Sequence, residues 1–140
     1  MIKVEDLMVG NLVKVIGTES VFTDGEICSV ESVDRIYGVA SLKGIDWGVE
    51  ECGFLKNRRE IDPIPLTPEI LERNGFEMRE DTVVYAKNRL ALKPLDDEKG
   101  YQVGLGSLRL FYVKVSVIKY VHELQNILYW IDGENANLTI

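Results

Sequence analysis

A proline-rich stretch near the middle of the chain, residues 61–75 (IDPIPLTPEILERNG), constrains the fold most, because it holds three of the four prolines in 140 residues. Proline has no backbone N–H to donate. Pro63 and Pro65 therefore exclude a central strand and indicate an edge strand or a crossing segment. The stretch predicts two parts of the chain: residues 1–65, a small β unit, and residues 66–140, an α+β unit packed against it. A single compact domain stays open as the alternative.

The second half of this stretch carries the start and stop signals of a short helix. Thr67 is a suitable N-cap, and Pro68 then falls at the first helical position, where a missing N–H costs nothing. Asn74 and Gly75 supply the stop, since glycine accepts the left-handed conformation that ends many helices. A helix of about two turns is marginal in water, so we expect its apolar residues to dock on a sheet. These residues are Ile70, Leu71 and Phe76.

The part before the prolines reads as a series of short strands separated by turns. Residues 12–16 are rich in β-branched side chains, and Asp24-Gly25 is a strong turn signal before residues 27–33. Ile27, Val30 and Val33 are spaced by three, so a helical turn stays open there. Short strands with frequent turns indicate a small barrel or sandwich. Residues 7–13 (LMVGNLV) are similar to the first strand of SH3-like barrels.

The part after the short helix predicts an antiparallel sheet followed by a longer helix. Strands are expected at residues 82–87, 90–93, 101–105 and 108–117. From about residue 119 the apolar period changes to 3.6, and Gly133 is a plausible stop. One helix face would carry Val121, Leu124, Leu128 and Ile131, and another His122, Gln125 and Asn126. The predicted fold class is α+β: an N-terminal SH3-like β-barrel or small sheet, a short connector helix, and an antiparallel sheet covered by the C-terminal helix.

Composition bounds the functions that this chain can perform. The formal net charge is −7, which opposes binding to phosphate backbones and to anionic membranes at long range. Lys3, Glu5 and Asp6 stand where a secretory signal would need its apolar core, and the run 127–131 is far too short to span a membrane. The two cysteines, Cys28 and Cys52, do not form a CxxC pair. We expect a cytoplasmic protein that does not bind membranes.

The residues that could carry chemistry do not form a recognisable catalytic or metal-binding pattern. His122 is the only histidine, and no partner stands at a spacing typical of nucleophilic catalysis. One histidine and two distant cysteines do not complete a typical zinc site. We therefore predict no catalytic residue, no metal and no cofactor. The candidate binding residues are Trp47, His122, Gln125 and Asn126.

Two longer stretches and one short one carry a family resemblance. Residues 61–76, residues 120–129 (YVHELQNILY) and the opening residues 10–13 (GNLV) resemble, as a set, small uncharacterised proteins of gut anaerobic bacteria and their phages. The likeness covers nearly the whole chain. It implies a bacterial or mobile-element origin and no activity.

Three functional hypotheses follow from these patterns. The leading one is a non-enzymatic binding or adaptor module for a protein or peptide partner. The first alternative is a small ligand-binding protein or enzyme with a pocket between the two parts that uses His122. The second alternative is a nucleic-acid-associated protein, which the negative charge disfavours. The sequence does not indicate an oligomeric state.

Overall fold

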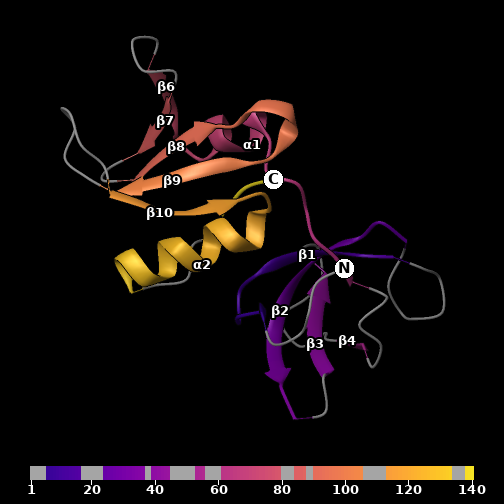
Figure 1. The fold of residues 1–140 in the computed structure, drawn as a ribbon. Helices are drawn as coiled ribbons and strands as arrows, with labels where there is room; N and C mark the ends of the chain where they lie inside the picture. Colours follow the sequence, from indigo (N-terminus) through magenta and orange to yellow (C-terminus); the bar gives the residue numbers. More distant parts are fainter. Residues whose placement is uncertain are drawn as a thin grey trace. The chain divides into compact units, whose positions relative to one another are not determined.

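The protein is an α+β structure in which the chain forms two compact units. The computed structural model describes residues 6–16, 24–36, 39–44, 53–55, 61–79, 84–87, 90–105, 113–133 and 138–140 (Figure 1). The first unit comprises Met1–Ile64 and Val121–Asn137, and the second comprises Pro65–Tyr120 and Leu138–Ile140. In the described part of the chain, no helix is long and apolar enough to cross a membrane.

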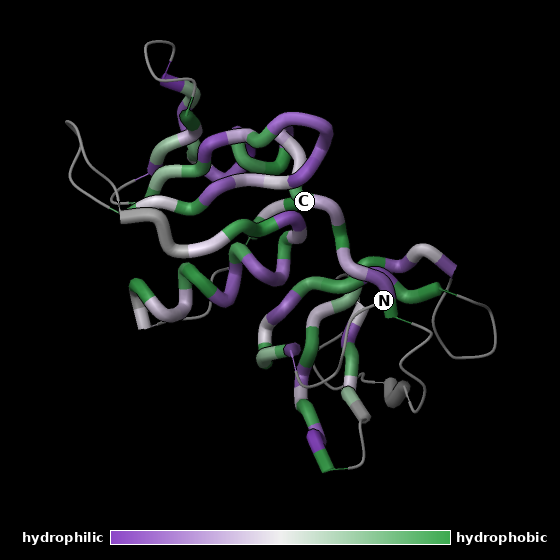
Figure 2. The backbone as a smooth tube through the Cα atoms, viewed as in Figure 1, coloured by the Kyte–Doolittle hydropathy of each residue, from purple (hydrophilic) through white to green (hydrophobic). Residues whose placement is uncertain are grey.

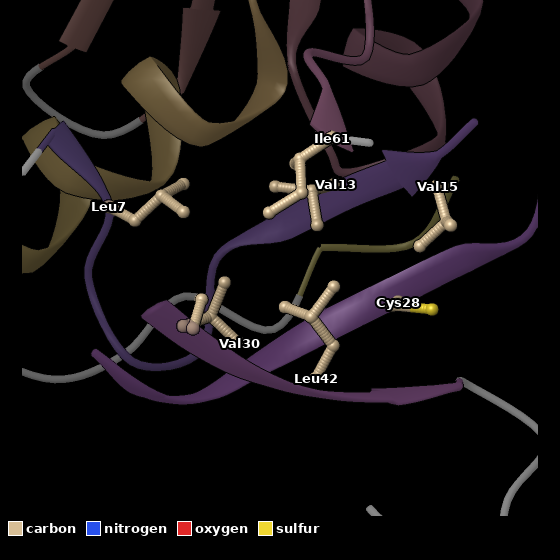
Figure 3. Close-up of a cluster of buried hydrophobic side chains, with 8 residues drawn as sticks. Leu7, Val13, Val15, Cys28, Val30, Leu42 and Ile61 are labelled. Atoms are coloured by element: carbon tan, nitrogen blue, oxygen red, sulfur yellow. The ribbon is translucent and has the colours of Figure 1, made fainter. Parts of the chain in front are cut away.

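The first unit contains a five-stranded antiparallel sheet in the order β4-β3-β2-β1-β5. Its strands are β1 (Leu12–Val15), β2 (Ile27–Asp34), β3 (Val39–Gly44), β4 (Gly53–Leu55) and β5 (Ile61–Asp62). In β2 the buried residues alternate at Cys28 and Val30, as expected when one face of a sheet meets the core. The core cluster consists of Leu7, Val13, Val15, Cys28, Val30, Ala40, Leu42 and Ile61 (Figure 3). Among the described residues the sheet does not close into a barrel, because β4 and β5 are its two edges.

Strand β2 is continuous, which resolves the mixed periodicity of its sequence. Val30 pairs with Leu42 and Ser32 pairs with Ser41, so the register with β3 shifts between Val30 and Ser32. Such a bulge places one extra residue in the strand and changes which side chains face the core. The spacing of three between Val30 and Val33 therefore reflects a bulged strand and not a helical turn.

The longer helix, α2 (Val121–Asp132), forms as predicted but belongs to the first unit. Figure 2 shows hydrophobic and hydrophilic residues alternating in bands along it, as in an amphipathic helix. Val121 and Leu124 are buried. The sequence grouped this helix with the second part of the chain, whereas in the structure its Gln125 amide binds the backbone of β1 and of the segment before it. An apolar stripe predicts a buried face but does not identify the sheet that buries it.

The second unit contains a five-stranded antiparallel meander in the order β10-β9-β8-β7-β6. Its strands are β6 (Glu77–Arg79), β7 (Val84–Lys87), β8 (Leu90–Pro94), β9 (Tyr101–Leu105) and β10 (Val113–Ile118), with a 3-10 turn, η3 (Asp96–Glu98), between β8 and β9. Each strand pairs with its neighbour in the sequence. The predicted pairing of the segments at 82–87 and 90–93 is confirmed.

The short helix α1 (Pro68–Arg73) lies in the second unit and confirms the predicted caps. The hydroxyl of Thr67 accepts a hydrogen bond from the backbone N–H of Ile70 at 3.3 Å, and Pro68 occupies the first turn. Asn74 is the C-cap, and Gly75 has a φ of +86°, the left-handed conformation that ends the helix. The apolar residues expected to dock, Ile70, Leu71 and Phe76, are all buried. The ammonium of Lys87 on β7 lies 5.8 Å from the centre of the Phe76 ring.

Candidate functional site

Three of the four candidate binding residues lie on α2, and the fourth, Trp47, lies outside the described residues. His122, Gln125 and Asn126 occupy the face of the helix next to the segment that leads into β1. We define this segment, residues 6–12, as the N-terminal loop. The structure thus places the three residues on one helix, and the hydrogen bonds of Gln125 and Asn126 define what these two residues do.

Gln125 is buried and uses both ends of its side-chain amide. Its Oε1 accepts from the backbone N–H of Leu12 at 2.7 Å, and its Nε2 donates to the carbonyl oxygen of Gly10 at 3.0 Å. The side chain therefore satisfies a backbone donor and a backbone acceptor that would otherwise be buried without protein partners at considerable cost. Gln125 fastens the N-terminal loop to α2.

Asn126 and Asn11 extend this connection. The Nδ2 of Asn11 donates to the Oδ1 of Asn126 at 2.8 Å, and the Nδ2 of Asn126 donates to the carbonyl oxygen of Asp6 at 3.3 Å. The Oδ1 of Asn11 accepts from the backbone N–H of Met8 at 2.8 Å. The amides predicted to bind a ligand are thus engaged within the chain, as the anchor of the N-terminal loop.

His122 is also buried, with a relative exposure of 6%. Burial lowers the pKa of its imidazole from the usual 6.5, because the charged form is disfavoured away from water. The negative charges of Glu123 and Asp6 act in the opposite direction and have a smaller effect. His122 is therefore neutral at neutral pH.

A small depression lies between the N-terminal loop and α2. It is lined by Met8, Val9, Gly10, Asn11, Gln125, Asn126 and Tyr129, and its volume is about 10 Å³. This is room for about one water molecule. The depression itself is too small for a metabolite.

A further reactive group among the described residues, the thiol of Cys28, is buried. Burial, and to a smaller extent the charge of Glu26, raises the pKa of the Cys28 thiol to about 12. At neutral pH this sulfur is a protonated thiol inside the core and not a nucleophile. No group of three or more histidine, cysteine or acidic side chains that could hold a metal occurs in the part of the chain that the structure describes.

An exposed apolar surface at the end of α2 is the feature that the sequence interpretation missed. Trp130 is 79% exposed, and Ile131, which was assigned to the apolar face of the helix, is 39% exposed. Tyr129 makes an edge-to-face contact with Trp130, with ring centres 6.3 Å apart. Val9, 51% exposed, lines the small depression together with Tyr129. We call Val9, Tyr129 and Trp130 the aromatic surface, because Tyr129 lines the depression with Val9 and contacts the ring of Trp130.

The charge of the protein is concentrated in the unit that carries the aromatic surface. The first unit has 7 basic and 15 acidic residues, a formal charge of −8, and the second has 9 basic and 8 acidic residues, a formal charge of +1. Residues 121–137 include three acidic residues and no lysine or arginine.

No family model, no curated protein and no solved structure matches this chain. The family resemblance described above stays a prediction.

Proposed function

We propose that this protein is a non-enzymatic binding or adaptor module, and that its first unit binds a basic segment of a protein or peptide partner. The observation that carries the proposal is the coincidence of the aromatic surface with a formal charge of −8 in one unit. An isolated exposed apolar residue is ordinary, but a tryptophan that is 79% exposed beside a second aromatic ring is the kind of residue that dominates binding interfaces.

The chemistry of the aromatic surface favours a partner rich in arginine or lysine. The face of a tryptophan ring attracts cations, and a guanidinium can stack on it. The negative field of the unit would attract such a partner over a distance of about one Debye length, roughly 8 Å at physiological salt, and would speed its association. Trp130 would contact the partner directly, and the acidic residues would attract it from a distance.

The strand order supports the finer part of this proposal, an SH3-like binding unit. In an SH3-like barrel five antiparallel strands follow one another, and the last strand returns to pair with the first. In this unit β5 pairs with β1 through Val15 and Ile61, and β2 carries a bulge of the kind that bends a strand. Trp47 belongs to the same unit and stays a candidate for the binding face.

The proposal is tested by isothermal titration calorimetry, in which a synthetic peptide of alternating arginine and leucine is added to the protein and the affinity is measured. We expect binding that weakens as salt is added and that falls about tenfold or more in Trp130→Ala, the loss typical of an interface hot spot. Val117→Ala is the matched control, because Val117 is an exposed apolar residue of the second unit. Its affinity should equal that of the unmodified protein.

A peptide with glutamate in place of arginine tests the charge argument separately and should not bind. The proposal is contradicted if Trp130→Ala binds the basic peptide as tightly as the unmodified protein does. It is equally contradicted if the acidic peptide binds as well as the basic one.

A further inference from the structure

The side chain of Asn74, just after α1, holds the last residues of the chain in place within the second unit. Its Oδ1 accepts from the backbone N–H of Thr139 at 2.7 Å, and its Nδ2 donates to the carbonyl oxygen of the same residue at 2.7 Å. The Nδ2 also donates to the carbonyl oxygen of Ile70 at 2.7 Å. In Figure 1 the C-terminal end of the chain accordingly lies close to α1.

This arrangement depends on a carboxamide and on no other group. A carboxamide offers an acceptor and a donor side by side, as a peptide group does, so Asn74 pairs with Thr139 as a neighbouring strand residue would. Both hydrogens of Nδ2 are used, one for Thr139 and one for the carbonyl oxygen of Ile70, which also accepts from the backbone N–H of Asn74 at 3.2 Å. We call residues 138–140 the terminal segment.

Asn74 is followed by Gly75, and the pair Asn-Gly is chemically labile. The backbone nitrogen of Gly75 can attack the side-chain carbonyl carbon of Asn74. The new C–N bond closes a five-membered imide, and the side-chain nitrogen leaves as ammonia. Water then opens the imide to aspartate or isoaspartate. Glycine favours the reaction because it has no Cβ to hinder the attack, and no oxidant, reductant or enzyme is needed.

We propose that Asn74 is a deamidation site and that its conversion to an acid is an irreversible release of the terminal segment. The product has an oxygen where Nδ2 was, so it would face the carbonyl oxygens of Ile70 and Thr139 without a hydrogen to share. The new negative charge also lies at the carboxyl end of α1, where the helix dipole disfavours it. The ammonium of Lys87, which donates to the main-chain oxygen of Asn74 at 2.7 Å, offsets only part of this charge.

The fold protects the amide for as long as the terminal segment is bound. The N–H of Gly75 donates to the carbonyl oxygen of Glu72 at 3.1 Å, and the carboxamide is held by its three bonds, so both reacting groups are engaged elsewhere. Detachment of the segment removes two of these bonds and leaves the side chain free to react. The reaction then prevents the terminal segment from binding again, so the fraction of molecules with an acid at position 74 increases with each detachment.

The first experiment examines the product. In Asn74→Asp we expect the backbone N–H of Thr139 to exchange with deuterium about tenfold faster or more, because the variant keeps the acceptor and loses both donors. Asn126→Asp is the matched control, since it makes the same atomic change on a helix of the first unit. It should leave exchange at Thr139 unchanged. Protection of Thr139 in Asn74→Asp equal to that in the unmodified protein would overturn the proposal.

The second experiment examines the reaction. The full chain and its Thr139→Pro variant, which lacks the N–H that binds Oδ1, are kept at mildly alkaline pH and analysed by peptide mapping with mass spectrometry. We expect acid to appear at Asn74 faster in Thr139→Pro than in the unmodified chain, and slowest in Gly75→Ala. Equal rates in the unmodified chain and in Thr139→Pro, or no acid at Asn74 in either, would refute the protective role of the terminal segment.

Discussion

At the scale of single residues, the burial of His122 links its charge to the stability of the first unit. Burial lowers the pKa of the folded protein's imidazole below the usual 6.5, whereas the unfolded chain keeps an ordinary value. Between the two values the unfolded state binds more protons than the folded state. The stabilisation from the neutral imidazole is therefore complete above the unfolded pKa and is lost as the pH falls toward the folded pKa.

We predict that the first unit loses stability when the pH is lowered from about 7 to about 5, and that His122→Gln loses less. Both tryptophans, Trp47 and Trp130, belong to this unit, so tryptophan fluorescence measured during urea unfolding reports the unfolding of the first unit. The difference between the two proteins isolates the imidazole from the carboxylates, which titrate in both. An identical pH dependence in the two proteins would show that His122 is not the group responsible.

Single residues were sufficient to predict structure where their hydrogen-bond partners are close in the sequence. Thr67, Pro68 and Gly75 fix the ends of α1 through their own backbones and side chains, and the structure confirms each. Gln125 was different. Its place on a polar face predicted contact with a ligand, but the residue is buried against backbone groups that lie more than 100 positions away in the sequence. No local pattern encodes such a partner.

At the scale of elements, the amide of Gln125 joins α2 to β1. The two groups it binds, the N–H of Leu12 and the carbonyl of Gly10, lie at the start of β1 and just before it. Removal of the amide leaves a buried donor without its partner, and each unsatisfied buried group costs about 1–3 kcal/mol. The loss is larger than that of an ordinary hydrogen bond.

We predict that Gln125→Met, which preserves most of the side-chain volume, lowers the free energy of unfolding of the first unit by roughly 3 kcal/mol. Asn126→Ala, whose bonds are less buried, should lower it by only about 1 kcal/mol. Urea unfolding at constant pH, with the fluorescence midpoint and slope compared, provides both values. A cost of Gln125→Met no greater than that of Asn126→Ala would mean that the connection resides elsewhere.

The elements themselves were easier to predict than their partners. The 3.6-residue period identified α2, but the same stripe could have faced either sheet. In β2 the bulge between Val30 and Ser32 disturbed the alternation that identifies a strand, and the sequence alone could not separate it from a helical turn. The predicted barrel was inferred from the number of short strands, and strand number alone does not determine whether a sheet closes.

At the scale of the whole molecule, charge is the property with the most direct consequence. The net charge of −7 opposes polyanions, and the first unit alone carries −8. We predict that the protein passes through a heparin column at low salt without retention, because it offers no strongly basic unit to displace counterions from the polymer. It should bind an anion-exchange column at the same salt and pH. Retention on heparin that declines as salt is raised would favour a nucleic-acid-associated function instead.

The discontinuity of the first unit has a consequence for the order in which the protein folds during synthesis. Residues 1–64 leave the ribosome first, yet the helix that anchors their N-terminal loop is encoded after the whole second sheet. Domains usually fold in the order in which they emerge. In this chain the N-terminal loop can be anchored only after Gln125 and Asn126 have been synthesised. The meander of the second unit can therefore form while the first unit still lacks α2. The unit whose sheet is translated first is therefore completed only after the second sheet has been translated.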